Sequence, residues 1–285
     1  MPTPLVASCG MVAESRVSTD QLGELMARSD VRVVDLRISL DDTRAGHRSY
    51  LEAHIPGAVY LHWFDDLSDP NDPVPGNLAP PDRFEQTMEF AGIGPRTLVV
   101  AYDDNELFMA ARLAWCLRAY GHDAVRVLDG GFPKWQREGR PVEPGLVRTV
   151  RVPGFTANPQ PALRVDRQRV IDLLDRDDAV LLDCRMDATW ESAGEHIPGA
   201  RRLPAPSLVR GAGGTLLAVE DIAALAEQAG AERDSDVVLY CGGGVSASLA
   251  FEALQAAGYR RVSIYDGSWS DWASDDSLPR EHHER

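Results

Sequence analysis

The residues best suited to chemistry surround Cys241, which lies where a strand pattern ends and a helical pattern begins. The apolar run 237–240 before it is typical of a buried strand. The first N–H groups of a helix have no partner within the helix and carry partial positive charge, which stabilises a thiolate. Glycines at such a junction can turn their N–H groups inward around an anion. The pattern predicts a nucleophilic Cys241 in a cradle of amides from Gly242, Gly243 and Gly244, next to the helix that Val245 and Ser246 begin.

The alternative interpretation is a buried structural cysteine beside a glycine turn. A single Cys-Gly pair would favour that interpretation, but three consecutive glycines between a strand and a helix favour the nucleophile.

The composition is that of a soluble globular protein with a strong excess of acidic residues. The chain has 285 residues, enough for two ordinary domains, and 44% of them are hydrophobic. Its formal net charge of −15 argues against nucleic acid or an anionic membrane surface as a partner. A small anionic substrate remains compatible with this charge, because a local field can oppose the overall one.

The four cysteines are Cys9, Cys116, Cys184 and Cys241, and no two of them form a Cys-x-x-Cys pair. We therefore expect no metal site, no disulfide framework and a reducing, cytoplasmic environment. Cys116 falls in a helical pattern and Cys184 in a strand pattern, so both are expected to be packed rather than reactive. Residues 6–9 loosely resemble a lipoprotein cleavage site, but no basic segment or apolar core precedes them. No other run is long enough to span a bilayer, so no membrane partner is expected.

Four motifs occur twice in the same order, which indicates a duplication. They are Asp-x-Arg, His-Ile-Pro-Gly-Ala, an apolar run that ends in Tyr, and Asp-Gly followed by Trp. The first set is Asp35–Arg37, His54–Ala58, Val99–Tyr102 and Asp129–Trp135, and the second is Asp183–Arg185, His196–Ala200, Val237–Tyr240 and Asp266–Trp272. The repeat has the size of a domain rather than of a short solenoid unit. We predict a first domain at 15–140, a proline-rich linker at 141–162 and a second domain at 163–280.

Strand and helix signals alternate within each copy. We expect strands at about 31–36, 98–102, 124–128, 179–183, 237–240 and 261–265, and helices at about 18–27, 106–119 and 245–257, with another starting near Asp166. This alternation predicts α/β domains, each with a mostly parallel sheet covered by helices on both faces. Ligands of such sheets bind beyond the carboxyl ends of the strands, which is where Cys241 lies. Residues 68–81 are expected to form a long loop, and the tail from Arg280, which contains two histidines, is expected to be frayed.

Together these motifs resemble the two-domain rhodanese-type sulfurtransferases, which act on thiosulfate or 3-mercaptopyruvate. The resemblance spans about Val17 to Trp272. It implies that Cys241 takes a sulfur atom from a small anionic donor, becomes a persulfide and passes the outer sulfur to cyanide, a thiol or a protein. No metal or organic cofactor is implied. In the first copy Asp103 stands opposite Cys241, and 104–106 replace the glycines, so the resemblance makes that domain a scaffold.

The uncharged loop resembles the 3-mercaptopyruvate branch, although Gly243 occupies a position where that branch usually has serine. The family binds the donor carboxylate with arginines between Asp-x-Arg and His-Ile-Pro-Gly-Ala, but residues 186–195 contain none, and Thr189 stands at the first of these places. Arg185 is either a donor-binding residue or, like Arg37, half of a structural ion pair. Candidate replacements for the missing arginines are Arg201 and Arg202.

His54 corresponds to a histidine that is considered an active-site residue in the 3-mercaptopyruvate enzymes. Its motif recurs at His196, which favours a shared role in positioning the turn. We therefore leave its catalytic role open.

A cysteine phosphatase or arsenate reductase needs Cys-x5-Arg, and Ala247 stands where that arginine would be. A persulfide carrier fed by a partner protein, or a regulatory module of the same fold, remains the alternative to turnover of a small donor.

Overall fold

The structure is a computed structural model that describes residues 15–174, 176, 179–211 and 214–283. The segment 6–9, with Cys9, lies outside these residues. Within the described part, no helix has the length and apolar character needed to cross a membrane.

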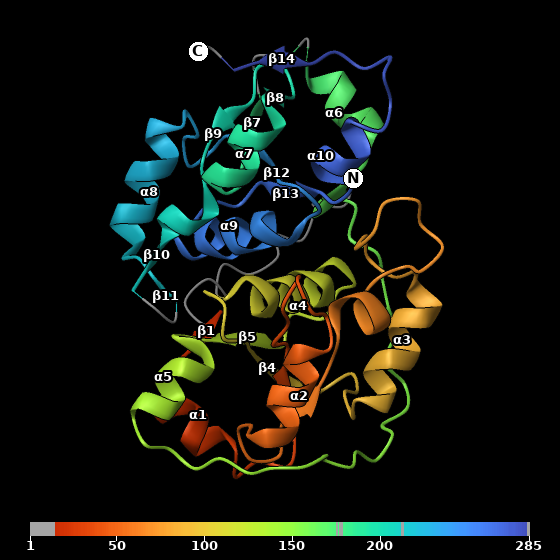
Figure 1. The fold of residues 1–285 in the computed structure, drawn as a ribbon, viewed down its shortest axis with the longest axis vertical. Coiled ribbons are helices and arrows are strands. Elements are labelled where there is room, and N and C mark those ends of the chain that lie inside the picture. The colour runs from red at the N-terminus through yellow and green to blue at the C-terminus, as the bar shows by residue number, and fades with distance from the viewer. Residues whose placement is uncertain (1–14, 175, 177–178, 212–213, 284–285) are drawn as a thin grey trace, which may run out of the picture.

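The first half contains a five-stranded parallel sheet in the order β1-β5-β4-β2-β3. Helices cover both faces of this sheet (Figure 1), and buried apolar side chains fill the space on each side of it. The strands are β1 (Arg16–Val17), β2 (Val31–Asp35), β3 (Val59–Tyr60), β4 (Leu98–Tyr102) and β5 (Val125–Leu128), and the α-helices are α1 (Thr19–Leu25), α2 (Ala45–Glu52), α3 (Pro81–Phe90), α4 (Phe108–Ala119) and α5 (Gly131–Arg137). A short π-helix, Trp63–Leu67, follows β3.

The second half repeats this plan with the sheet order β6-β13-β12-β7-β9, again parallel throughout. Its strands are β6 (Arg164–Val165), β7 (Ala179–Asp183), β9 (Arg201–Arg202), β12 (Asp236–Tyr240) and β13 (Val262–Tyr265), and its α-helices are α6 (Arg167–Leu173), α7 (Asp187–Ala193), α8 (Val219–Gln228), α9 (Val245–Ala256) and α10 (Ser268–Trp272). The remaining elements are β8 (Glu195–His196), β10 (Val209–Arg210), β11 (Thr215–Leu216), β14 (Glu281–His282) and the 3₁₀-helix Ala205–Leu208. The predicted fold class is confirmed.

The strands that carry the core are short apolar runs, as expected for sheets that are buried on both faces. In β4 and β12, every residue after the first is buried. The start of α1 is fixed by the capping box expected at Ser18 and Gln21, in which each residue binds the backbone of the other. The equivalent helix α6 starts at Asp166, whose carboxylate accepts the N–H of Arg169.

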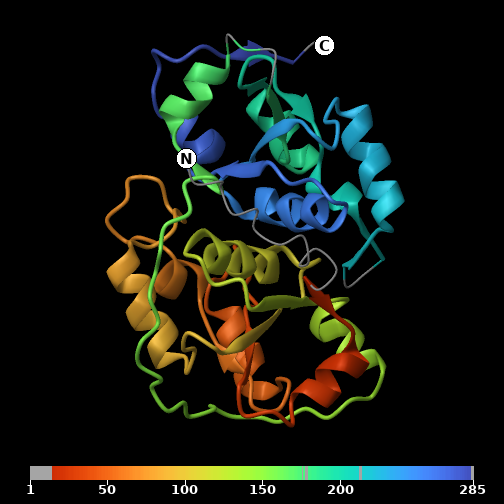
Figure 2. The same ribbon diagram turned by 180° about the vertical axis from the view of Figure 1, so that it is seen from behind.

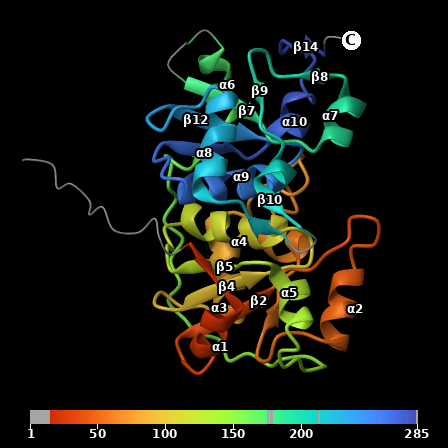
Figure 3. The same cartoon turned by 90° about the vertical axis from the view of Figure 1, so that its left-hand side faces the viewer.

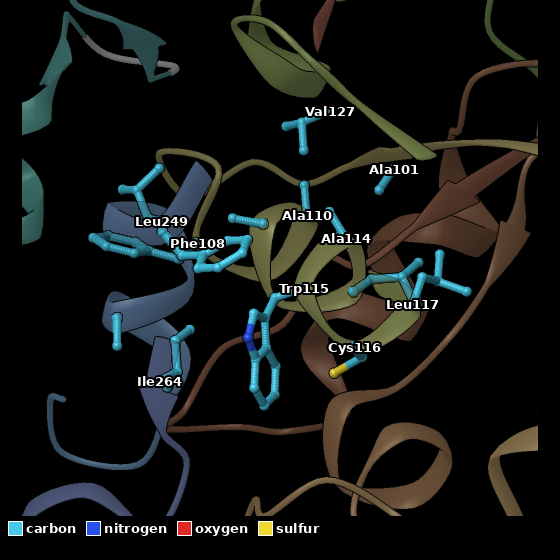
Figure 4. Packing of buried hydrophobic residues seen from close by; sticks show 14 of the residues in the cluster. Ala101, Phe108, Ala110, Ala114, Trp115, Cys116, Leu117, Val127, Leu249 and Ile264 are labelled. Carbon is cyan, nitrogen blue, oxygen red and sulfur yellow. The ribbon is translucent and has the colours of Figure 1, made fainter. Parts of the chain in front are cut away.

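The two halves share one core, which runs through the contact between α4 and α9 (Figure 3). Figure 4 shows Phe108 and Trp115 of α4 directed toward Leu249 of α9 and Ile264 of β13. Because α4 packs against its own sheet on one side and α9 on the other, nearly all of its residues are buried. This packing fixes the position of the carboxyl end of β4 relative to that of β12.

The segment between the halves runs as an extended strap along the first half (Figure 2). Its backbone bonds to that half at several points: Glu143 and His54 exchange two N–H···O bonds, and the Val152 N–H donates to the Glu89 carbonyl. The loop 68–81 closes on itself through a bridge between Ser68 and Leu78.

The expectation of a frayed tail is wrong for Glu281–His283. Glu281 and His282 form β14, which pairs antiparallel with β8, and the His283 N–H donates to the Gly194 carbonyl. Polar residues in a two-residue strand produce no apolar pattern, so propensity alone could not indicate this pairing.

Candidate active site

Cys241 lies between the end of β12 and the start of α9, as the sequence predicts. The helix begins after Gly244, which adopts φ 79°, and no side chain caps its first turn. Its first N–H groups therefore remain available to a bound anion. A Cβ atom at Gly244 would lie 2.7 Å from Nη1 of Arg112 and 2.8 Å from Oδ1 of Asp266. Both the backbone conformation and the close neighbours require glycine here.

The loop carbonyls are bound by the residues that begin α10. The Trp269 N–H donates to the Cys241 carbonyl at 2.9 Å, and the Ser270 N–H and hydroxyl donate to the Gly242 carbonyl at 3.0 and 2.7 Å. In a trans peptide the C=O and N–H groups point in opposite directions, and the described residues contain no cis peptide. The N–H groups of Gly242 and Gly243 therefore point away from α10, and both residues line a cavity.

Ser268 fixes the two ends of the loop. Its hydroxyl oxygen accepts the N–H groups of Cys241 and Gly244, each at 3.1 Å, while the hydroxyl donates to the Tyr265 carbonyl at 2.9 Å. Ser268 has φ 54°, which is uncommon for a residue with a side chain. Sequence reasoning missed this residue. The signal was present, because the first copy has Gly131 at the matching position, also at φ 54°.

The cavity that contains Cys241 has a volume of about 620 Å³ and lies between the halves. Among the described residues that line it, Glu106 and Arg185 alone are charged. Its lining is Ile38, Ser39, Leu40, Trp63, Asn105, Glu106, Phe108 and Met109 from the first half, and Arg185, Met186, Thr189, Cys241, Gly242, Gly243, Val245 and Ser246 from the second.

Arg185 is both a structural residue and a cavity residue. Its Nε and Nη2 donate to the Asp183 carboxylate at 2.6–3.0 Å, and Nη2 also donates to the Glu195 carbonyl. The guanidinium carbon lies 4.9 Å from the Trp190 ring centre and 4.8 Å from that of Trp269. Its Nη1 atom is buried and has no hydrogen-bond partner among the described residues. A buried donor of this kind is costly unless a ligand satisfies it.

The first half supports the loop from behind through Arg112 of α4. Its Nη1 forms an ion pair with Asp266 at 2.7 Å, and its Nη2 donates to the Gly76 carbonyl at 2.9 Å. The second Asp266 oxygen accepts the Leu78 N–H at 2.9 Å. The expected loop 68–81 therefore contacts the second half, and the Asp of the repeated Asp-Gly motif links the halves beside Gly244.

Comparison with known proteins agrees with this geometry. The family described as "Rhodanese-like domain" matches residues 18–138 and 166–275. The chain belongs to the rhodanese family. The 3-mercaptopyruvate sulfurtransferase of Escherichia coli strain K12 is 30% identical over 275 residues, which cover 93% of this chain and 97% of that protein.

Two further relatives support the same assignment. A putative thiosulfate sulfurtransferase, SseB, of Mycobacterium tuberculosis strain H37Rv is 32% identical over 276 residues, covering 90% of this chain and 93% of that protein. The crystal structure of SseA from Escherichia coli, described as a 3-mercaptopyruvate sulfotransferase, superposes with a TM-score of 0.82 at 30% identity, covering 90% of this chain and 99% of that one. The family resemblance inferred from the sequence is confirmed.

In the first rhodanese domain, Asp103 fills the place that Cys241 has in the second. Its carbonyl accepts the Phe132 N–H, as the Cys241 carbonyl accepts that of Trp269. Its carboxylate accepts four backbone N–H groups at 2.8–3.1 Å, those of Asn105, Leu107, Met109 and Ala110. The cradle is thus occupied by an internal carboxyl group, and α4 starts at Phe108 rather than Glu106, because Glu106 and Leu107 adopt positive φ.

The other candidate residues lie away from this cavity. His54 is fully buried and its ring stacks on Tyr50 with centroids 4.2 Å apart. Its Nε2 lies 3.5 Å from a Glu143 oxygen, as Nε2 of His196 lies 3.5 Å from Glu281. This repeated arrangement is that of a turn-positioning residue.

Neither proposed replacement arginine lines the cavity. Arg201 lines a different hollow, together with Leu173 and Gly230. Arg202 pairs with Asp187 and donates to the Arg185 carbonyl, so its charge is already engaged. Thr189 does line the cavity, as its place in the sequence suggested.

The other described cysteines are unsuited to nucleophilic chemistry. Cys116 and Cys184 are fully buried. Burial raises the pKa of Cys116 to about 11 and that of Cys184 well above its ordinary value. Both thiols are therefore protonated at neutral pH, and neither lines the cavity that contains Cys241.

Proposed function

We propose that this chain moves a sulfur atom from a small anionic donor, 3-mercaptopyruvate in preference to thiosulfate, to a thiophilic acceptor through a persulfide on Cys241. Family membership and the named relatives make the chain a sulfurtransferase. One observation supports the role of Cys241. Residues that begin α10 bind the carbonyls of Cys241 and Gly242, so the N–H groups of Gly242 and Gly243 point away from α10. N–H groups held in this way stabilise negative charge on the transferred sulfur.

The first step forms a sulfur–sulfur bond and breaks a carbon–sulfur bond. The Cys241 thiolate attacks the thiol sulfur of 3-mercaptopyruvate, and the electron pair of the broken bond passes to the departing carbon. Protonation of the resulting enolate gives pyruvate and leaves Cys241 as a persulfide. In the second step a thiolate or cyanide attacks the outer sulfur, and the Cys241 thiolate is regenerated.

The charges of the cavity support the choice of donor. The 3-mercaptopyruvate carboxylate carries one negative charge, which the free Nη1 of Arg185 can bind. Thiosulfate carries two, yet Arg185 already pairs with Asp183, and Glu106 also lines the cavity. The apolar side chains of Trp63, Phe108 and Met109 add no compensating charge. A monoanion is therefore favoured over a dianion.

Exposed apolar residues beside the cavity support a protein or thiol acceptor, and they also fit a second candidate function. Leu40 from one domain and Met186 from the other are 69% and 43% exposed beside the entrance. Exposed apolar side chains at a site entrance suit contact with another protein. A persulfide carrier that receives sulfur only from a partner protein is the second candidate.

We also propose a reducing, cytoplasmic location and no nucleic acid or membrane partner. The support is the net charge of −15 and the free state of Cys116, Cys184 and Cys241.

Steady-state turnover with each donor tests the proposal. Pyruvate release from 3-mercaptopyruvate and sulfite release from thiosulfate are measured with the same thiol acceptor, for the wild type and Cys241→Ser. We expect a higher kcat/KM for 3-mercaptopyruvate and no turnover by the variant. A higher value for thiosulfate would overturn the donor assignment. If neither donor is used but a persulfidated protein loads Cys241, the carrier function is the correct one.

A further inference from the structure

Helix α7 forms part of the cavity wall but has little packing of its own. Met186, which precedes it, and Thr189 within it line the cavity beside Arg185. None of the seven residues of α7 is buried. A short helix without a buried face draws little stability from its own contacts, so something else must hold it in place.

Trp190 is the residue of α7 with the most extensive ring contacts. On one side its ring stacks on His283, with centroids 3.8 Å apart and planes at 7°. The guanidinium carbons of Arg202 and Arg185 lie 4.4 and 4.9 Å from the ring centre. Trp190 therefore connects the C-terminal segment to Arg185 in the cavity wall.

The C-terminal segment is fixed by several bonds before it reaches Trp190. Glu281 and His282 pair with β8, and the Glu281 carboxylate accepts the Gly199 N–H. The His283 N–H donates to the carbonyl of Gly194, at the end of α7. Burial, and then the positive charges of His196 and Arg185, lower the pKa of His283, so the ring is neutral at pH 7 and stacks as an aromatic group.

The first domain holds the corresponding helix in place through a buried residue of that helix. Its equivalent helix α2 has a fully buried Tyr50, whose hydroxyl donates to the Ala58 carbonyl and whose ring stacks on His54. In the second domain Trp190 of α7 contacts His196 in a similar way, with ring centroids 4.8 Å apart, but Trp190 is only partly buried, and His283 supplies a second aromatic face from outside the helix.

We propose that His283 is a positioning residue for donor binding, which holds Trp190 against Arg185 so that the free Nη1 of Arg185 faces the donor carboxylate. This inference rests on the proposed function. Asp183 fixes one edge of the guanidinium group, and the rings of Trp190 and Trp269 fix its faces. Loss of His283 removes the support behind Trp190 without touching Cys241 or its loop.

The test is single-turnover formation of the Cys241 persulfide at varied 3-mercaptopyruvate concentration, which gives a donor Kd and a limiting rate. His283→Ala is compared with His283→Phe, which keeps the stacking, and with His282→Ala. His282 is the matched control, because its side chain faces Glu195 and is 80% exposed. We expect His283→Ala to raise the donor Kd about three- to ten-fold with little change in the limiting rate. The Phe variant and the control should stay near the wild type.

A second measurement repeats His283→Ala in a Trp190→Leu background. If His283 acts through Trp190, the second substitution should add little to the first. An unchanged donor Kd for His283→Ala, an equal rise for His282→Ala, or a full additional effect in the Trp190→Leu background would each overturn the inference. Failure of the proposed function is distinct from these results, because the wild type would then form no persulfide with this donor.

Discussion

The guanidinium of Arg112 in the first rhodanese domain lies 2.7 Å from the carboxylate of Asp266 in the second, and both side chains are buried. The same arginine lies beside the carbonyl of Gly244, the last residue before α9. The first domain therefore supports the loop of the second domain that contains Cys241. Asp266 also accepts the N–H of Leu78, so that two separate parts of the first domain converge on one carboxylate.

Arg112→Met should destabilise the protein strongly. It removes one partner of a buried ion pair, a change that typically costs about 3–5 kcal/mol. Arg164, which lies 3.2 Å from the second Asp266 oxygen, keeps part of the charge compensated, so we expect a cost near the lower end of this range. Urea unfolding measures the loss, and Arg151→Met is the control. Arg151, whose side chain is 55% exposed, pairs with Glu89 at the surface, and its loss should cost far less. Equal effects of the two substitutions would contradict the structural role of Arg112.

Ser268→Gly tests the role of the Ser268 hydroxyl separately from the backbone strain at this residue. Glycine accepts φ 54° more readily than serine, but it leaves the N–H groups of Cys241 and Gly244 without their acceptor. We expect persulfide formation to slow about ten-fold or more, since the geometry of the amide cradle loosens. Ser270→Ala removes one of two bonds to the Gly242 carbonyl and should change the rate less. Wild-type rates in Ser268→Gly would show that the hydroxyl has no part in the site.

Alkylation should distinguish Cys241 from the other described cysteines. At pH 8 Cys116, with a pKa of about 11, and Cys184, whose pKa burial also raises well above its ordinary value, remain almost entirely protonated. In a Cys9→Ser chain, peptide mapping after brief exposure to iodoacetamide should find the label first on Cys241. Cys116→Ala and Cys184→Ala should retain nearly full activity. Early labelling of Cys184, or loss of activity on its replacement, would mean that the site contains a second reactive thiol.

Asp103 should make stability depend on pH. Burial raises its pKa from an ordinary value of 3.8 to about 7. Between these pH values the folded protein retains a proton that the unfolded chain has released, so the free energy of unfolding falls as the pH rises toward 7. Asp103→Asn removes this contribution.

The stability of the Asn variant relative to the wild type should therefore increase by about 2 kcal/mol between pH 5 and pH 8. Urea unfolding at both pH values measures this difference. A constant difference would show that the four backbone N–H groups, which favour the charged carboxylate, outweigh its burial.

Much of this architecture follows from local patterns. The apolar runs that form β4 and β12, the capping box at Ser18 and the repeated motifs are all properties of short segments. They were sufficient to predict mostly parallel sheets covered by helices and the place of Cys241 between a strand and a helix. The resemblance between the copies also predicted that Asp103 stands in the place of the nucleophile. It did not predict that its carboxylate binds the cradle from within.

The features that sequence reasoning missed depend on contacts between distant segments. Nothing around Arg112 or Asp266 indicates that they meet, because each lies on a different domain. The absence of arginine at 186–195 suggested replacement by Arg201 and Arg202, but Arg202 pairs with Asp187, and Arg201 lines a hollow that does not contain Cys241. The pairing of β14 was missed for the same reason, because it depends on β8, and His283, which follows β14, stacks on the distant Trp190.

The most direct test of the central claim is the intact mass of the protein after incubation with 3-mercaptopyruvate and, separately, with thiosulfate, followed by peptide mapping. The account predicts a gain of one sulfur atom with 3-mercaptopyruvate, located on the peptide that contains Cys241, and no gain in Cys241→Ser. A sulfur atom gained equally by the Cys241→Ser variant, or none gained by the wild type with either donor, would contradict it.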